Sequence, residues 1–252
     1  MLKGGLLVRS ESFTIHQIIG NPLNEVKRFN EWNVDELIYL DITRGDHYDM
    51  RRSDHKVRIE NDPIAILKAV SRTCFMPLTW GGQITSVDDM HVRFRNGADK
   101  ITVNTAAVAD PGLISKGARA FGSQAIVVSI DAKRDASGAA TVWVDGGRAD
   151  TGMGVAEWAR EAERAGAGEI LLQSIDRDGT GEGYDIDLIR EASDSVTIPV
   201  IACSGVGRYE DYVEGIRAGA SAAAAANIWH FKELSDLGGK RALAAAGIPV
   251  RL

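Results

Sequence analysis

Cysteine and long apolar segments are scarce in this sequence. Its two cysteines, Cys74 and Cys203, among 252 residues exclude a disulfide framework and indicate a reducing cytoplasm. No apolar run approaches the roughly 20 residues that span a bilayer. The start of the chain does not resemble a signal peptide either. We therefore expect a cytoplasmic protein with no membrane partner.

Positive charge is also in short supply. Lysine and arginine number 29 against 35 aspartates and glutamates, which leaves a net charge of −6. This balance argues against a protein that binds nucleic acid electrostatically. His47 and His55 stand among acidic residues, but their spacing matches no familiar metal site. The sequence therefore predicts no nucleic-acid partner, no metal and no cofactor.

Internal repetition is the most informative feature that the chain does have. The sequence around Pro77 and Gly97 recurs around Pro199 and Gly219, 122 residues further on in both cases. Two copies of a strand–turn–helix–strand unit indicate duplicated half-barrels. A chain of this length suits one (β/α)8 barrel, which typically has about 250 residues. We predict a single α/β barrel domain over residues 1–252.

Apolar runs alternate with amphipathic stretches, as a parallel sheet covered by helices requires. The predicted strands are 36–42, 76–80, 100–104, 125–131, 169–175, 199–203 and 221–226. The predicted helices are 22–32, 63–72, 87–95, 111–121, 154–165, 186–195, 210–217 and 240–246. The first strand of the barrel is missing from this series. It is a stub, it is built from residues 1–8, or, as we favour, the start is set too late.

The first half of the chain is longer than the second. Glu36 and Glu169 are 133 residues apart rather than 122, so about eleven extra residues fall within 43–56. This segment follows a strand and is therefore expected over the catalytic mouth. Its arginines, Arg51 and Arg52 among them, predict contacts to an anionic part of the ligand. The alternative is a solvated loop.

Asp131 ends a buried strand, where an ionisable group faces the mouth of a parallel barrel. Burial and neighbours can tune such a group for proton transfer. The alternative is a structural carboxylate that caps the next turn or pairs with Lys133 or Arg134. After the following strand, Asp176 and Asp178 either contact a ligand or close a polar turn.

Backbone N–H groups after the seventh and eighth strands are the usual phosphate site of parallel barrels. The repeat supplies an equivalent set after the third and fourth strands. Two such sites predict a long ligand with an anionic group at each end. The residues concerned are Gly205, Ala226 and Asn227 in one set, and Gly82, Asn104 and Thr105 in the other.

Three charged residues, Glu36, Lys100 and Glu169, open buried strands and would gather at the bottom of the barrel. They form either a salt-bridged plug or a gate on a passage through the barrel.

Several long motifs resemble one known family, the cyclase subunit of imidazole glycerol phosphate synthase. The matching stretches are 97–107, 122–134, 166–172, 174–180 and 183–185. The similarity covers nearly the whole chain from about Asn21 onward. It implies a (βα)8 barrel that takes ammonia from a glutaminase partner at its bottom. The ammonia then reacts with a bis-phosphorylated ribulosyl substrate at the top.

The resemblance also implies roles for individual residues. The family uses two aspartates as acid and base, of which Asp131 matches the second and the first has no match. The ammonia gate carries over to Glu36, Lys100 and Glu169. The phosphate motifs carry over to Asp178, Gly179, Gly205 and Ala226 on one side, and to Asn104 and Thr105 on the other.

Some positions depart from the family. Gln83, Gln173 and Asn227 replace a glycine, a threonine and a serine. Residues 75–79 and 225–231, together with the enlarged loop, resemble a paralogous branch that occurs with surface-polysaccharide genes. Proteins of this branch are thought to pass ammonia to a nucleotide-linked or nonulosonic sugar. The sequence favours this branch, with a glutaminase subunit as partner in a heterodimer. One alternative is the cyclase of histidine biosynthesis, which forms imidazole glycerol phosphate and aminoimidazole carboxamide ribotide. Another is a catalytically silent ammonia conduit.

Overall fold

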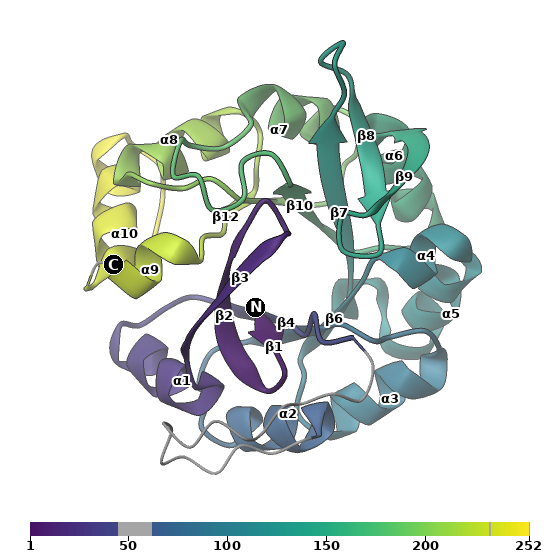
Figure 1. Cartoon of the computed structure of the whole chain (residues 1–252), viewed down its shortest axis with the longest axis horizontal. Coiled ribbons are helices and arrows are strands. Elements are labelled where there is room, and N and C mark those ends of the chain that lie inside the picture. The colour runs from purple at the N-terminus through teal and green to yellow at the C-terminus, as the bar shows by residue number, and fades with distance from the viewer. Residues whose placement is uncertain (45–61, 232, 252) are drawn as a thin grey trace. The chain divides into compact units, whose positions relative to one another are not determined.

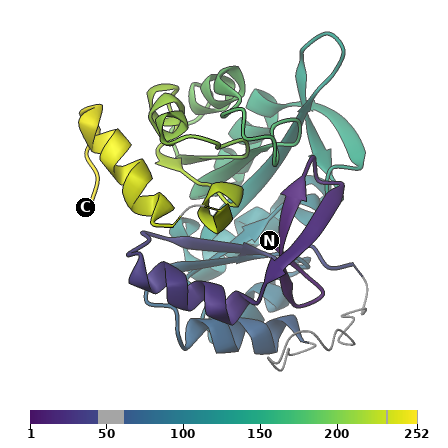
Figure 2. The same cartoon turned by 60° about the vertical axis from the view of Figure 1, so that its left-hand side comes forward.

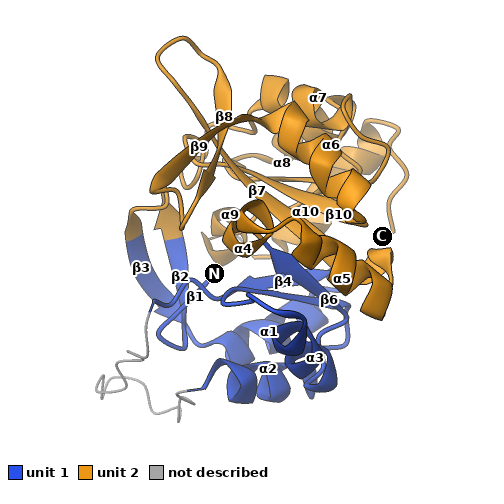
Figure 3. Cartoon of the chain, turned by 90° about the vertical axis from the view of Figure 1, so that its right-hand side faces the viewer, with its two compact units in different colours: residues 1–9, 16–103 blue, residues 10–15, 104–252 orange. Residues whose placement is uncertain are grey.

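The computed structural model describes residues 1–44, 62–231 and 233–251, and the chain folds into two compact units (Figure 3). Unit 1 comprises residues 1–9 and 16–103, and unit 2 comprises residues 10–15 and 104–252. Both units are built from parallel strands and helices, so the predicted α/β fold class is confirmed. The single-domain organisation stays a prediction.

Unit 1 contains a parallel sheet of β4 (Leu37–Leu40), β5 (Leu78–Gly81) and β6 (Lys100–Val103), in that order. The helices α1 (Pro22–Glu31), α2 (Pro63–Ser71) and α3 (Val87–Arg95) lie along one side of this sheet (Figure 1). Asn21 and Asp62 accept backbone hydrogen bonds in the first turns of α1 and α2, each of which opens with proline. This is the cap that the sequence predicts.

The N-terminal strands of unit 1 form their own sheet and contact the parallel sheet at Leu2. A separate sheet contains β1 (Leu2–Lys3), β2 (Leu6–Glu11) and β3 (Ile15–Gly20), in that order. Leu2 forms a single parallel bridge with Asp41, and its carbonyl accepts a 2.8 Å hydrogen bond from the Ile42 amide. The first strand is therefore a stub, one of the predicted alternatives. The expectation of a late start stays a prediction.

Unit 2 contains the parallel strands β7 (Ile126–Arg134), β10 (Glu169–Ser174), β11 (Val200–Cys203) and β12 (Ala222–Ala223), in that order. Its longer helices are α5 (Gly112–Phe121), α6 (Val155–Ala165), α7 (Ile186–Ser193), α8 (Tyr209–Arg217) and α10 (Ser235–Ala245). These strands and helices lie within or close to the predicted ranges, except that α10 begins five residues before its predicted start at Lys240.

The sequence did not predict an antiparallel extension of β7. Strand β8 (Ala140–Val144) pairs antiparallel with the end of β7 and also with β9 (Ala149–Gly154), and the teal hairpin that joins β7 to β8 projects from unit 2 in Figure 2. Two short helices were also missed, α4 (Thr105–Ala109) and α9 (Asn227–Phe231). Both are too short to show helical periodicity.

The buried strands position the functional groups. Ile126, Val128 and Ile130 of β7 are fully buried, as expected for a strand covered on both faces. Among the residues described, we find no helix with the length and apolar character that a bilayer crossing requires. Arg51 and Arg52 of the enlarged loop lie outside the described residues.

Candidate functional site

Asp131 is held by a network of neutral donors. Its side chain is 4 % exposed and lies near the C-terminal end of the parallel part of β7. Oδ1 accepts hydrogen bonds from Gln173 Nε2 at 2.9 Å and from Ser129 Oγ at 3.3 Å. Oδ2 accepts from Asn104 Nδ2 at 2.7 Å. The structure thus brings together four polar side chains from three segments of unit 2.

Strand register explains why these side chains meet. Asp131 of β7 stands directly opposite Gln173 of β10 in the parallel ladder. Ser129 precedes Asp131 by two residues, so the two share a face of the strand. Asn104 comes directly before α4 and points its amide nitrogen at the carboxylate. We expected Asn104 at a phosphate, but within the described residues its donor binds Asp131.

The environment of Asp131 raises its pKa from the ordinary 3.8 to about 7. Burial is the largest cause, because it penalises the charged carboxylate. The donors Gln173, Ser129 and Asn104 lower the pKa, and the charge of Asp178 raises it. A carboxyl group that titrates near neutral pH can serve as a general acid or base. A catalytic role for Asp131 in proton transfer stays a prediction.

The raised pKa predicts how stability depends on pH. The native state keeps the Asp131 proton up to about pH 7, whereas an unfolded aspartate releases it near 3.8. Stability from this group is thus fully present below pH 4 and is lost as pH rises through 7. Asp131→Asn removes the coupling between deprotonation of residue 131 and folding. We therefore expect the variant to be more stable than the wild type at pH 8, by up to about 4 kcal/mol. Urea unfolding at pH 4.5 and pH 8 measures the difference.

The control is Asp135→Asn, which changes an exposed carboxylate just after the same strand. Hydrogen bonds from Ser137 hold the pKa of Asp135 below its usual value. That variant should gain no stability at pH 8. An Asp131→Asn protein with the same pH dependence as the wild type would contradict the titration of Asp131 near neutral pH.

Within the described residues, Asp131 pairs with neither Lys133 nor Arg134. Arg134 pairs with Asp185 instead, through bonds of 2.8 Å from Nε and 2.7 Å from a terminal nitrogen. Half-burial raises the pKa of Asp185, but the Arg134 bonds and the Leu188 amide hold it below its usual value. Lys133 lies over the Trp143 ring, 4.8 Å from its centroid. No feature of the sequence predicted the Arg134–Asp185 pair.

Asp178 and Gly179 hold the tip of the N-terminal hairpin. The Asp178 carbonyl accepts from the Ser12 amide at 3.0 Å, and its Oδ2 accepts from the Phe13 amide at 3.1 Å. Gly179 has a φ of +78°, and a Cβ there would meet the Ser10 carbonyl oxygen at 2.4 Å. Only glycine fits this turn without moving the hairpin. Both predicted residues therefore anchor the hairpin tip in the loop that follows β10.

The other predicted phosphate residues also follow strands. Gly205 comes after β11, and its carbonyl accepts from the Gly183 amide at 2.8 Å. Ala226 precedes α9, and Asn227 donates from Nδ2 to the Ser10 carbonyl at 3.4 Å. Thr105 opens α4, and its hydroxyl accepts from the Asp145 amide at 3.0 Å. In unit 1, Gly82 follows β5.

Two of the three predicted gate residues meet. Lys100 Nζ lies 3.1 Å from Glu36 Oε2, in unit 1, where Lys100 opens β6 and Glu36 precedes β4. Glu169 opens β10 in unit 2. The gate itself stays a prediction.

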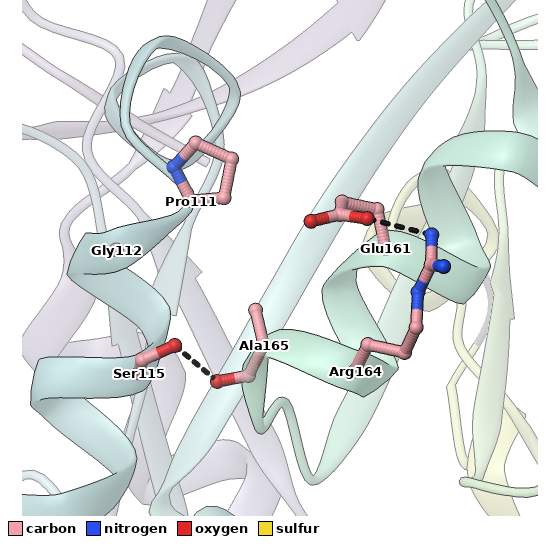
Figure 4. A pocket seen from close by; sticks show the side chains of 6 residues that line it. All are labelled: Pro111, Gly112, Ser115, Glu161, Arg164 and Ala165. Carbon is pink, nitrogen blue, oxygen red and sulfur yellow. Dashed lines mark hydrogen bonds and ion pairs between the residues drawn. The ribbon is translucent and has the colours of Figure 1, made fainter.

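A groove of about 390 Å³ lies away from this network, between α5 and α6 (Figure 4). Ser115 Oγ donates to the Ala165 carbonyl at 2.8 Å, and Arg164 pairs with Glu161 at 2.6 Å. The groove contains none of the predicted site residues. In the described part of the chain, no cluster of three or more His, Cys, Asp or Glu side chains is placed to hold a metal ion.

Parallel βα units with a buried carboxylate at the end of a strand are typical of the βα-barrel class of enzymes. Comparison with known proteins is more specific, because the family model described as "Histidine biosynthesis protein" matches residues 2–235. The chain belongs to this family.

Curated relatives agree with this assignment. The chain is 44% identical over 253 residues to "Imidazole glycerol phosphate synthase subunit HisF" of Gluconacetobacter diazotrophicus, covering 99% of this chain and 93% of the relative. It is also 44% identical to the proteins of that name from Caulobacter vibrioides, over 100% of this chain and 93% of the relative, and Pyrobaculum aerophilum, over 99% and 94%.

Proposed function

We propose that this protein is the cyclase subunit of an imidazole glycerol phosphate synthase. The observation that carries the proposal is Asp131, a buried carboxylate with a pKa of about 7 held by neutral donors. The relatives described above all bear the name of that synthase. They favour the histidine-pathway cyclase over the sugar-amidating branch that the sequence motifs favoured.

The proposed reaction joins ammonia to a bis-phosphorylated ribulosyl substrate. Ring closure and cleavage then yield imidazole glycerol phosphate and aminoimidazole carboxamide ribotide. Each step that makes or breaks a C–N bond moves a proton, and Asp131 is placed to take or deliver one. Asn104 Oδ1 is buried and has no hydrogen-bond partner among the described residues. It supplies an acceptor for an N–H or O–H group of the substrate.

The reaction is tested by supplying ammonium salt and the ribulosyl substrate to the purified chain. Ammonium replaces the glutaminase, so the chain is assayed for chemistry alone. We expect both products in equal amounts by liquid chromatography. A folded protein that forms neither product would contradict the cyclase and leave the silent ammonia conduit as the better account.

The ammonia is proposed to come from a glutaminase partner that docks where Glu36 and Lys100 meet. Lys100→Glu places two carboxylates together at this position, and like charges at an interface are strongly unfavourable. We expect glutamine-dependent turnover with the partner to fall at least about tenfold, while ammonium-dependent turnover stays unchanged. Parallel assays with glutamine and with ammonium measure the two turnover rates separately.

Lys116→Glu is the matched control, because Lys116 pairs with Asp110 at 3.4 Å on α5 and neither residue opens a strand. It should leave both activities intact. Equal loss of both activities in Lys100→Glu would show a folding defect rather than a docking surface.

Sugar amidation is the second candidate function. Gln83 holds a φ of +54°, a backbone conformation in which glycine is the unstrained residue, and its Nε2 donates to the Thr43 carbonyl at 3.1 Å. Gln173 adds a second side-chain amide beside Asp131. These two amides replace the family's glycine and threonine at two strand ends, which favours a ligand other than the ribulosyl substrate. Calorimetric binding of a nucleotide-sugar, with no binding of the ribulosyl substrate, would support this candidate over the cyclase.

A further inference from the structure

Gln173 contacts Asp131 both directly and through Ser129, although it cannot itself carry a proton at neutral pH. Its side chain is 7 % exposed. Nε2 donates both to Asp131 Oδ1 at 2.9 Å and to Ser129 Oγ at 3.2 Å. The Ser129 hydroxyl, having accepted that bond, directs its own hydrogen to Asp131 Oδ1 at 3.3 Å. One amide thus binds the carboxylate directly and also orients its second donor.

We infer that Gln173 is a positioning residue, whose amide holds the Asp131 carboxylate in one orientation and favours its ionised form. The donors to Asp131 are neutral, so they stabilise its negative charge without cancelling it. With Gln173 and Ser129 on Oδ1 and Asn104 on Oδ2, rotation of the carboxylate would break several bonds at once. Only the effect on turnover rests on the proposed function.

The groups around the carboxylate support an effect of Gln173 on its ionisation. From β10 and its following loop come the Gln173 amide and the Asp178 charge, which raises the pKa. From β8, Trp143 stands opposite Asp131, and its ring is covered by Lys133. Burial remains the largest influence on the pKa of Asp131, and among the hydrogen bonds that lower this pKa the bond from Gln173 has the largest effect.

The test is a ¹³C NMR titration of the aspartate carboxyls in the full chain, with Asp131→Asn to assign the signal of Asp131. Gln173→Met keeps the length of the side chain and removes its donor. Because a hydrogen bond to a charged group contributes one to two pKa units, we expect the pKa of Asp131 to rise by about that amount. Ser129→Ala removes a longer bond and should produce a smaller rise.

Gln124→Met is the matched control, since Gln124 is an exposed glutamine whose side chain bonds only weakly, at 3.5 Å, to the Phe121 carbonyl. It should leave the Asp131 titration unchanged. A folded Gln173→Met protein in which Asp131 titrates as in the wild type would overturn the inference, even if its thermal stability falls. If that variant does not fold, Gln173→Leu, which also lacks a donor, is judged by the same criterion.

Turnover with ammonium supplies an independent readout. In Gln173→Met we expect kcat to fall about tenfold or more, KM to change little, and the pH–rate profile to move with the Asp131 titration. A kcat and pH profile equal to those of the wild type would also count against the inference. If the wild type forms no product, the proposed function fails, while the NMR titration still decides the role of Gln173.

Discussion

Asp131→Asn lowers ammonium-dependent product formation by about 10²–10⁴-fold, the contribution typical of a general acid–base group. The amide keeps the size of the carboxyl group but can neither accept nor release the proton. The stability expected of this variant at pH 8 ensures that the loss reflects chemistry rather than unfolding. Initial rates with saturating ammonium and ribulosyl substrate measure the effect.

The pH dependence of the rate identifies the group further. The wild-type rate should change with pH around pH 7, where Asp131 titrates. The residual activity of Asp131→Asn should lack this change. Asp135→Asn serves again as the control and should keep both the rate and its change with pH. A variant at Asp131 with more than about one tenth of the wild-type rate would remove this residue from the chemistry.

Gly179→Ala should lower stability more than the neighbouring substitution Gly181→Ala. The new Cβ would meet the Ser10 carbonyl oxygen at 2.4 Å in a turn with a φ of +78°. The hairpin tip must then move, which breaks the bonds from the Ser12 and Phe13 amides to Asp178. We expect about 2–4 kcal/mol from backbone strain and two lost hydrogen bonds. Urea unfolding at pH 7 measures it.

Gly181→Ala is the control that separates the effect of backbone strain from the effect of contact with the hairpin. Gly181 has a φ of +71°, but a Cβ there meets nothing closer than the Gly207 Cα at 3.7 Å. This variant should lose only about 1–2 kcal/mol, the strain of a left-handed alanine. Equal losses in both variants would show that the hairpin contact contributes nothing measurable. A greater loss of ribulosyl-substrate affinity in Gly179→Ala would connect the hairpin with ligand binding.

Local pattern was enough to predict most of the secondary structure. The buried strands of β7 and β10 are continuous apolar runs, and α1 and α2 begin with a polar cap followed by proline. These signals work because each depends on residues only a few positions apart. The hairpin of β8 and β9 escaped prediction although Asp145-Gly146 between the two strands is a typical hairpin turn sequence, because both strands are short and partly polar.

Sequence alone also placed Asp131 at the end of a buried strand, where a parallel fold exposes reactive groups. Tertiary structure decided what surrounds it. Asn104 lies 27 residues away and Gln173 lies 42 residues away along the chain. The Phe13 amide reaches Asp178 across 165 residues. Such contacts depend on strand register and on where loops end, which the packing of the whole sheet determines. A periodic pattern can therefore locate a carboxylate, but its pKa depends on burial and donors that only the folded chain brings together.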